Sequence, residues 1–463
     1  MELSYLDIID QKQAVIDGVA DFLWENPETA FTEFKSAEKL CQVLRDEGFT
    51  VEENLAGIAT AFSGTFGSGK PVIGVLGEFD ALSGLGQVEG LAEPMPNGQD
   101  CGHGCGHNLL GAGSLGAAIA IKHYLETTGR EGTVIYFGCP GEEGGSGKAF
   151  MARDGVFDCL DAALCWHPDD ITRVRIKHSL ANYQVLYKFD GKASHAGAKP
   201  HLGRSALDAV ELMDMGVNYM REHMIDEARI HYAIVDTGGY SPNVVQAHAE
   251  VLYLIRAPHN HQVKELYERV CDIAQGAALM TGTKASHEFI KGCSSYVHNH
   301  TLLERMSQCM AAIGVPEPSE EDIAFARAIT ENSLMGIPNH DVENPIHWQL
   351  QPFAGVTMPG FGSTDVSDVC WVCPTVELGA ATNAYSTPGH SWQMTVQSKS
   401  PWGKKMMRFA AKTMAATAIE LMEDPELLQK AKEEHKQRVG DGYVPPIPAG
   451  VKPRPMNSFG RKS

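Results

Sequence analysis

The residues best suited to chemistry stand in a short cluster, Asp-Cys-Gly-His-Gly-Cys-Gly-His-Asn, at residues 100–108. The cluster contains two thiols, two imidazoles and a carboxylate, and its glycines leave the backbone free to bend. Thiolate and imidazole are good ligands for a transition metal such as zinc or manganese. The cluster therefore indicates a metal site. Taken alone, it is also explained by a glycine-rich turn before a helix.

A second group, Cys-Pro-Gly-Glu-Glu-Gly-Gly-Ser-Gly at residues 139–147, follows an apolar run that ends at Phe137. Open α/β sheets place their active sites at the carboxyl ends of strands, where these adjacent carboxylates fall. One carboxylate can bind a metal that lowers the pKa of bound water toward ~7, and the other can take the proton. The alternative for the pair alone is a solvated turn.

Two further histidines stand at the ends of motifs. His167 closes the apolar run at residues 162–166, and His390 lies in Thr-Pro-Gly-His-Ser at residues 387–391. Either histidine alone is more simply structural. Together with the first two groups, they complete a set of residue types that can bind metal.

Apolar periodicity indicates the elements that hold these groups. Helices are expected before Gly48 and over 109–125, and strands over 58–62, 72–76, 134–137 and 162–165. Continuous apolar strands that alternate with helices predict an α/β fold with a sheet covered on both faces.

A second cycle of elements follows. Strands are expected over 183–189, near Ile230 and over 251–255, and helices over 205–223 and 262–280, which together would form a separate α+β layer. We therefore expect a catalytic domain at 1–180 and 292–463, interrupted by a smaller domain at 181–291. The segment 314–322 is expected to be a loop before a helix from Ile323, and the tail after Gly440 to be extended.

Composition narrows the partners. The chain has 463 residues, with 38 Lys and Arg against 58 Asp and Glu and a net charge of −20. This charge disfavours nucleic acid and anionic membranes. The N-terminus lacks a signal-peptide pattern, and the apolar stretch 109–121 is too short to span a bilayer. The eleven cysteines do not form a disulfide-like pattern, so we expect a cytoplasmic protein.

Taken in order, the motifs resemble the M20 family of metallopeptidases, in its amidohydrolase branch. Gly-Glu-Phe-Asp-Ala-Leu at 77–82, His-Gly-Cys-Gly-His-Asn at 103–108 and Pro-Gly-Glu-Glu at 140–143 are similar to family motifs, and the match runs over nearly the whole chain. The stretches 318–327, 362–366 and 388–393 are similar to p-aminobenzoyl-glutamate hydrolase B subunits and indoleacetyl-aspartate hydrolases.

The resemblance implies a catalytic domain with a mixed sheet flanked by helices, plus an inserted α+β lid and dimerisation domain. It implies one or two divalent ions, manganese or zinc, with Glu142 as general base. The implied metal ligands are Cys105, His107, Glu143, His167 and His390.

The resemblance also implies roles in the lid. His195 is similar to a histidine that holds the reacting carbonyl and that, in dimeric relatives, reaches the partner's active site. Asn243 and Arg256 stand where the family holds the substrate's carboxylate, for which an Arg fork is suited. The alternatives are a turn amide for Asn243 and a strand-end salt bridge for Arg256. A homodimer through the lid is expected, or a heteromer with a related subunit.

Two positions depart from the family pattern. Glu78 stands where many two-zinc members have a ligating histidine, and Asn108 stands where the branch commonly has Asp. The number and identity of the metals therefore stay open. Asp80 is expected to orient His107.

The expected function is hydrolysis of N-acyl or N-aroyl amino acids, such as p-aminobenzoyl-glutamate or indoleacetyl-aspartate. A metal-bound hydroxide would attack the amide, with Glu142 as base. A dipeptidase is the first alternative, and an inactive regulatory subunit is the second. A redox or zinc-storage protein built on residues 101–107 would leave Glu143, His167 and His390 unexplained.

Overall fold

The computed structural model describes residues 3–176, 179–355, 360, 362–455 and 458. The chain forms two compact units. The first unit contains Met1–Ile176, Val297–Thr357 and Val369–Tyr443, and the second contains Lys177–Tyr296, Met358–Asp368 and Val444–Ser463. The second unit thus takes in the segment expected at 181–291 together with two later segments that were expected in the catalytic domain.

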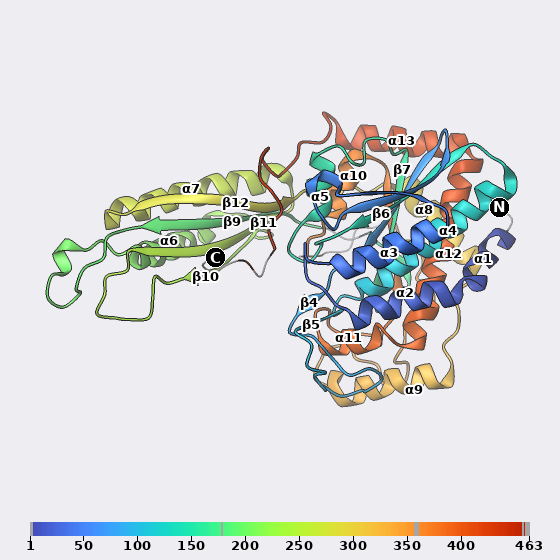
Figure 1. Ribbon diagram of the computed structural model, residues 1–463, viewed down its shortest axis with the longest axis horizontal. Helices are drawn as coiled ribbons and strands as arrows, with labels where there is room; N and C mark the ends of the chain where they lie inside the picture. The colour runs from blue at the N-terminus through green and yellow to red at the C-terminus, as the bar shows by residue number, and fades with distance from the viewer. Residues whose placement is uncertain (1–2, 177–178, 356–359, 361, 456–457, 459–463) are drawn as a thin grey trace. The chain divides into compact units, whose positions relative to one another are not determined.

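The first unit is built on a seven-stranded mixed sheet (Figure 1), with strand order β1-β2-β6-β3-β7-β13-β8. The pairs β3/β6, β3/β7 and β7/β13 are parallel, and the pairs towards both edges are antiparallel. The strands are β1 Thr50–Glu53, β2 Phe62–Ser68, β3 Val72–Glu78, β6 Gly132–Cys139, β7 Ala162–Asp169, β8 Arg173–Val174 and β13 Thr375–Ala381. A small hairpin joins β4 Leu82–Ser83 to β5 Cys101–Gly102.

Helices cover this sheet. Every residue of β6 and β13 is buried, so both faces of these strands are packed. The long helix α4, His107–Thr128, packs against β3, β6 and β7 and against α12, Pro401–Glu423. The remaining helices of the unit are α1 Asp7–Gln11, α2 Gln13–Glu25, α3 Phe34–Asp46, α5 Gly147–Arg153, α8 His300–Ile313, α9 Glu320–Ile329, α11 Trp392–Gln397 and α13 Pro425–Val439, while α10 Val366–Val372 spans the unit boundary. The α/β class with a mixed sheet is therefore confirmed.

The second unit has a four-stranded antiparallel sheet in the order β10-β11-β9-β12. Buried and partly buried residues alternate along β11, which means that one face of the sheet is covered and the other is not. The helices α6 and α7 provide the cover. The bounds are β9 Ala181–Asp190, β10 Arg229–Asp236, β11 His248–Ala257, β12 Lys284–Cys293, α6 Ala206–Met220 and α7 Asn260–Thr281.

Several elements differ from the expectations. The strand expected at 58–62 begins only at Phe62, and β1, β12 and β13 were not predicted. The loop expected up to residue 322 ends earlier, because α9 starts at Glu320. There Ser319 accepts a hydrogen bond from the Asp322 amide, and the Asp322 side chain bonds back to the Ser319 amide, which forms a capping box.

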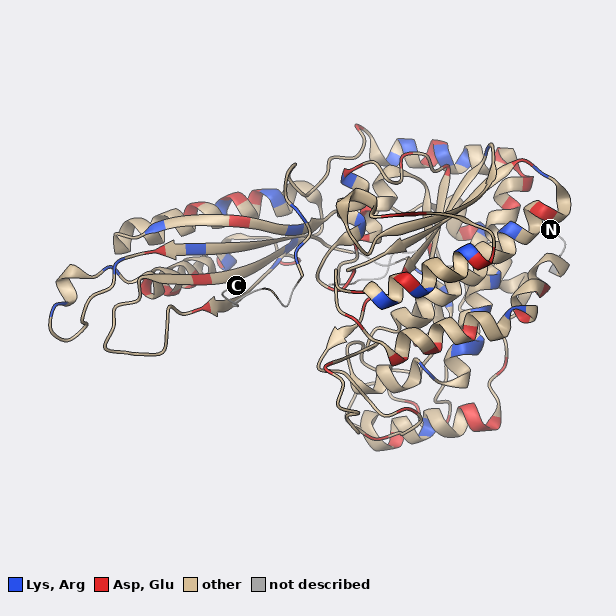
Figure 2. Cartoon of the chain, in the orientation of Figure 1, with Lys and Arg blue, Asp and Glu red and all other residues tan. Residues whose placement is uncertain are grey.

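Charged side chains of both signs alternate along α7 and α13 (Figure 2). Such alternation produces no extended field of one sign along these helices. Among the helices of the described residues, none has the length and apolar character needed to cross a membrane.

Candidate metal centre and lid residues

Three neighbouring parallel strands bring the predicted motifs to one edge of the sheet. β6, β3 and β7 end at Cys139, Glu78 and Asp169, respectively. Because the carboxyl ends of parallel strands share an edge, the loop after β6 and the end of β7 lie together. The start of α4 meets them there, and side chains from all three segments form clusters that could hold a metal.

The turn into α4 requires a glycine. Gly106 has a φ of 76°, in the left-handed region, and a Cβ at this position would meet Pro168 and Met394 at 2.9 Å. This backbone conformation separates Cys105 from His107 and lets both side chains contribute to the same cluster.

The first cluster consists of Cys105, His107 and His167, whose ligand atoms all lie within 4.8 Å of one another. Cys105 Sγ is 3.4 Å from His167 Nε2. His167 Nδ1 lies 2.6 Å from the Pro168 carbonyl, to which it donates, so Nε2 can serve as a ligand. Burial, followed by the charges of Arg175 and His107, lowers the pKa of His167 well below its ordinary value. His167 is thus held in the neutral form that a metal needs.

The second cluster contains Cys105, Glu143 and His390, again within 4.8 Å. His390 Nε2 is 3.1 Å from Glu143 Oε1. His390 has a φ of 56°, a costly conformation for a residue other than glycine, and its amide donates to the Gly104 carbonyl at 2.9 Å. Since Cys105 belongs to both clusters, its sulfur could serve as a ligand in either one.

Asp80 contacts one residue of each cluster. Its carboxylate lies 3.0 Å from His107 Nδ1 and accepts from the Glu143 amide at 2.7 Å. Burial alone would raise the pKa of Asp80, but the hydrogen bond and charge of His107 lower it below its ordinary value. The expected contact between Asp80 and His107 is present, and it leaves His107 Nε2 directed away from Asp80.

The electrostatics favour a cation at this centre. Although burial by itself lowers it, the charge of Cys105 and the hydrogen bond to Asp80 raise the pKa of His107 well above its ordinary value. Hydrogen bonds to Cys105 and then to Glu143 raise the pKa of His390 to about 10. Burial and the Glu143 charge raise the pKa of the Cys105 thiol. The carboxylates of Asp80 and Glu143 therefore stabilise positive charge beside them, and a metal at Cys105 would displace the thiol proton.

Two buried atoms also fit a metal. His107 Nε2 and Glu143 Oε1 are buried, and among the described residues they form ion-pair contacts, with Glu78 Oε2 at 3.3 Å and with His390 Nε2 at 3.1 Å, but no hydrogen bond of good geometry. Buried polar atoms are normally hydrogen-bonded, so a metal ligand role explains both. Thiolate, imidazole and carboxylate together form a donor set suited to a divalent transition metal.

Glu142 lies beside the clusters. One of its oxygens is within 4.8 Å of ligand atoms of Glu78 and His107. The neighbouring Glu143 belongs to the second cluster. The two adjacent carboxylates therefore point to different places, as a division between metal binding and proton transfer requires.

Glu33 was not predicted. It is fully buried, accepts a hydrogen bond from the Gly141 amide at 2.9 Å and one from the Thr60 hydroxyl at 2.9 Å. Burial, followed by the charge of Asp80, raises the pKa of Glu33 to about 8. Glu33 thus fixes the backbone immediately before Glu142. The polar break at 26–33 between two amphipathic helices was the available signal.

His195 lies on an exposed turn of the second unit. Its Nδ1 accepts from the amides of Gly197 and Ala198 at 3.2 and 3.1 Å. With Nδ1 as acceptor, Nε2 carries the proton and can donate a hydrogen bond outward. The segment pairs with that of Asn243, since the Ala196 amide donates to the Asn243 carbonyl at 2.9 Å.

Arg256 lies near the other end of β11. Its Nη1 donates to the Ser363 hydroxyl at 3.1 Å, and its Nε is buried without a hydrogen-bond partner. Burial lowers the pKa of Arg256. No described carboxylate pairs with it, so the strand-end salt bridge considered from sequence is absent among the described residues.

Asn243 and Arg256 are far apart in one chain. Asn243 precedes β11, while Arg256 is its penultimate residue. From His248 to Arg256 alone, the strand extends about 26 Å at ~3.3 Å per residue. β9 pairs with β11 throughout, and the ladder continues past it to His195 and Asn243. A single chain therefore does not bring Asn243 and Arg256 to one carboxylate, contrary to the simplest form of the expectation.

Comparison with known proteins identifies the family. Residues 74–349, more than half of the chain, match the model of peptidase family M20/M25/M40. The B-type subunit of p-aminobenzoyl-glutamate hydrolase from Escherichia coli K12 is 47% identical over 97% of this chain and 98% of that protein. The chain belongs to the M20 family.

Other M20 relatives differ in their named activities. An Xaa-Arg dipeptidase of Mus musculus is 26% identical over 92% of this chain and 90% of that protein. A solved structure of a dinuclear metal-binding M20 peptidase from Bacillus subtilis has a TM-score of 0.59 at 17% identity, covering 89% of this chain and 99% of that one. The resemblance and fold class stated from the motifs are confirmed, and the chain is a metal-dependent amide hydrolase.

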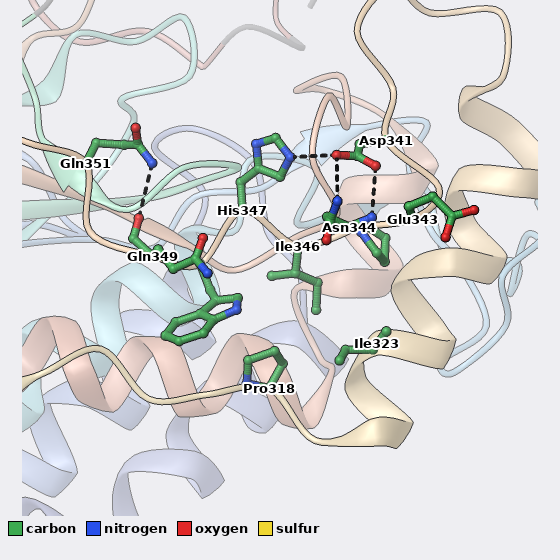
Figure 3. A pocket seen from close by; sticks show the side chains of 11 residues that line it. Pro318, Ile323, Asp341, Glu343, Asn344, Ile346, His347, Gln349 and Gln351 are labelled. Atoms are coloured by element: carbon green, nitrogen blue, oxygen red, sulfur yellow. Dashed lines mark hydrogen bonds and ion pairs between the residues drawn. The ribbon is translucent and has the colours of Figure 1, made fainter.

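A separate pocket of this M20 enzyme, of about 430 Å³, contains none of the candidate metal ligands (Figure 3). Asp341 accepts hydrogen bonds there from the Asn344 amide at 2.8 Å and from His347 Nε2 at 3.3 Å. The His347 ring stacks on Tyr385, with centroids 3.6 Å apart. Tyr385 lies in the loop between β13 and α11 that also carries His390.

Proposed function

We propose that the chain hydrolyses the amide bond of N-acyl or N-aroyl amino acids, with p-aminobenzoyl-glutamate as the first candidate. The observation that carries the proposal is the pair of ligand clusters that share Cys105, with Glu142 beside them. The 47% identity to a p-aminobenzoyl-glutamate hydrolase chain over nearly the full length supports the substrate class.

Five residues would hold the metal: Cys105, His107 and His167 in one cluster, and Cys105, Glu143 and His390 in the other. A divalent ion held there would supply Lewis acidity, lowering the pKa of a bound water toward ~7 and polarising the amide carbonyl. Thiolate and imidazole suit zinc, while the carboxylate also suits manganese. We propose one or two ions of either metal.

Glu142 would manage the protons. Its carboxylate lies next to the ligand atoms without belonging to either Cys105 cluster. From there it can take a proton from the attacking water and later deliver it to the departing nitrogen. The delivery is necessary because an amide anion is too basic to leave. Glu33 holds Gly141, and thus the backbone before Glu142, in place.

His195 would stabilise the oxyanion that forms on the carbonyl oxygen. Its Nδ1 is occupied by two backbone amides, so its Nε2–H is the group that can donate. Asn243 lies on the paired segment at the same end of the sheet. We propose that these two residues act on the active site of a second copy of the chain, while Arg256 serves its own.

Arg256 would bind the substrate's carboxylate. Its guanidinium is half-buried and lacks a described carboxylate partner, which fits a ligand that supplies one. A planar Arg fork binds a carboxylate through two parallel charge-assisted bonds. This would restrict substrates to amides of amino acids with a free α-carboxylate.

A second copy has a suitable surface to bind. β10 is an edge strand, and its Tyr232 and Ile234 are 39% and 41% exposed. On α6, Met215 and Tyr219 are 49% and 70% exposed. Unpaired edge strands and apolar helix faces associate readily. We propose a homodimer through β10 and α6. The Escherichia coli relative is named as one subunit of its enzyme, so the alternative is a complex with a related partner chain. The mass of the complex in solution distinguishes the two assemblies.

A dipeptidase is the second candidate, favoured by the 26% identity to an Xaa-Arg dipeptidase. It would use the same catalytic groups and differ in the acyl half. If the chain cleaved neither acyl-amino acids nor dipeptides, it would be a regulatory subunit. The presence of all the metal ligand types and of Glu142 disfavours that alternative.

The deciding experiment is hydrolysis of p-aminobenzoyl-glutamate, indoleacetyl-aspartate, hippurate and several dipeptides by protein loaded with Mn²⁺ or Zn²⁺. We expect aroyl- or acyl-amino acids to be cleaved with the higher kcat/KM. Preferential cleavage of dipeptides would establish the second candidate. No turnover at full metal occupancy would contradict both.

A further inference from the structure

Glu78 and Lys148 form an ion pair in the interior. Lys148 Nζ lies 2.7 Å from Glu78 Oε1, and the two side chains are 0% and 2% exposed, respectively. Glu78 is the last residue of β3, and Lys148 is the second residue of α5. The pair therefore joins the sheet edge that carries the metal clusters to the helix that follows Glu142.

Stability alone does not explain this pair. Removing two charges from water costs several kcal/mol per ion, and well-packed apolar residues often stabilise a fold equally well or better. A buried lysine and glutamate beside a functional site therefore call for a role in that site.

The second oxygen of Glu78 faces the metal side of His107. Glu78 Oε2 is buried and forms an ion-pair contact of 3.3 Å with His107 Nε2, but no hydrogen bond of good geometry among the described residues. His107 Nδ1 is committed to Asp80, so Nε2 is the atom left for a metal. Glu78, His107 and Glu142 also form a third group that could hold an ion.

We propose that Glu78 is a further metal ligand, which binds through Oε2 while Lys148 holds Oε1. This inference rests on the proposed metal centre. Lys148 fixes the carboxylate in one orientation and compensates part of the negative charge that a third anionic ligand adds to Cys105 and Glu143. A carboxylate beside His107 also makes that position harder, which favours manganese relative to a site of thiolate and imidazole only.

Four full-length variants test the proposal by the dissociation constants of Mn²⁺ and Zn²⁺, measured by competition with a chelator. Glu78→Gln keeps the shape and removes the anionic ligand. Lys148→Met removes the cation and leaves Glu78. The double variant Glu78→Gln/Lys148→Met removes both charges of the buried pair. It can therefore replace Glu78→Gln in the test if that single variant does not fold. Asp161→Asn is the control, since Asp161 is a buried carboxylate paired with Lys432 and Lys70 just before β7, at the opposite end from His167.

We expect Glu78→Gln and the double variant to bind metal at least about 10-fold more weakly than the wild type. Lys148→Met should weaken metal binding less than Glu78→Gln does, because the anionic ligand remains and only its fixed orientation is lost. Asp161→Asn should lower the melting temperature without changing metal affinity. Wild-type affinity in Glu78→Gln or in the double variant would overturn the proposal. So would a loss in Lys148→Met as large as that in Glu78→Gln, which would indicate a structural ion pair.

The two proposals fail separately. If wild-type protein binds metal but cleaves none of the tested amides, the proposed substrate class is wrong, while the comparison of metal affinities still decides the role of Glu78. If Glu78→Gln binds metal normally and the wild type cleaves aroyl-glutamate, only the role of Glu78 is wrong.

Discussion

His195 and Arg256 lie near opposite ends of the antiparallel sheet of the second unit, separated by most of the length of β11. β9 and β11 pair in continuous register from Ala181 and Ala257 to Asp190 and His248, so the separation is fixed by a rigid ladder. Two residues expected to contact one substrate thus cannot do so from one chain without breaking the sheet. This separation is the basis for the proposal that His195 acts on a second copy of the chain while Arg256 serves its own.

The first prediction is complementation between inactive variants. His195→Ala and Glu142→Ala should each be inactive alone. After exchange of subunits, a mixed dimer pairs an intact Glu142 on one chain with an intact His195 on the other, and about a quarter of wild-type activity should return. The measurement is activity after mixing equal amounts of the two variants.

The control is a mixture of His195→Ala with a His195→Ala/Glu142→Ala double variant, which offers no intact site in any combination and should stay inactive. If the first mixture also stays inactive although exchange is shown by labelled chains, His195 acts within its own chain and the dimer model is contradicted.

The second prediction concerns Asp80. Asp80→Asn keeps a similar shape but removes the negative charge of the carboxylate. That carboxylate orients His107 and accepts a hydrogen bond from the Glu143 amide. We expect metal affinity to fall by about 10- to 100-fold, as for other partners that orient metal ligands. Metal content after dialysis measures this directly. Unchanged metal content would mean that His107 keeps its orientation without Asp80.

The third prediction is a pH dependence of metal binding. The pKa of His390 in the metal-free protein is raised to about 10, so below that pH a metal must displace a proton. The dissociation constant should therefore decrease as pH rises from 6 to 9, by up to about 10-fold per unit for one proton. Calorimetry in buffers of different ionisation enthalpy counts the protons released, and His390→Ala should release fewer.

The raised pKa of His390 also affects the stability of the metal-free protein, which should fall as pH rises, whereas metal binding should strengthen. The folded-state pKa of His390 lies above its ordinary value of 6.5. Its contribution to stability is therefore complete below 6.5 and is lost as pH rises towards 10. A melting temperature of metal-free wild type that does not decline relative to His390→Ala over this range would contradict the shift.

The fourth prediction concerns Arg256. Arg256→Ala should reduce kcat/KM for p-aminobenzoyl-glutamate by about 100-fold or more, because the substrate carboxylate would lose a charge-assisted partner. It should reduce the rate for the α-carboxamide analogue much less. Arg256→Lys should recover only part of the loss, since lysine cannot form the planar fork. Equal losses on both substrates would mean that Arg256 does not bind the carboxylate.

The metal motifs could be found from sequence because each is local. Cys105 and His107 are separated by one glycine, and Glu142 adjoins Glu143, so residue types and spacing carry the chemistry. The strands β3, β6 and β7 were found for the same reason, since buried parallel strands form continuous apolar runs.

What the sequence did not indicate depends on distant contacts. Glu33 accepts a hydrogen bond from the Gly141 amide, which is more than a hundred residues away in the chain. Lys148 forms its ion pair with Glu78, which lies on another element. A capping box at Ser319 begins α9. The prediction of a loop there followed the nearby prolines instead of this signal.

The separation of Asn243 from Arg256 has a similar cause. Both flank the same strand, and motif matching places both in the lid without regard to direction. Only the register of β9 with β11 shows that they belong to opposite ends. Local spacing thus indicated the residue types of the centre, while only the sheet register shows how far apart the two lid residues lie.

The most direct test of the central claim compares wild type with Glu142→Gln, measuring hydrolysis of p-aminobenzoyl-glutamate and counting bound metal in both. We expect Glu142→Gln to lose activity by about 100-fold or more while it retains the wild-type metal content, since in the proposal Glu142 moves protons and the two Cys105 clusters, which do not include it, would hold the metal. Full activity in Glu142→Gln at equal metal content would contradict the proposed mechanism.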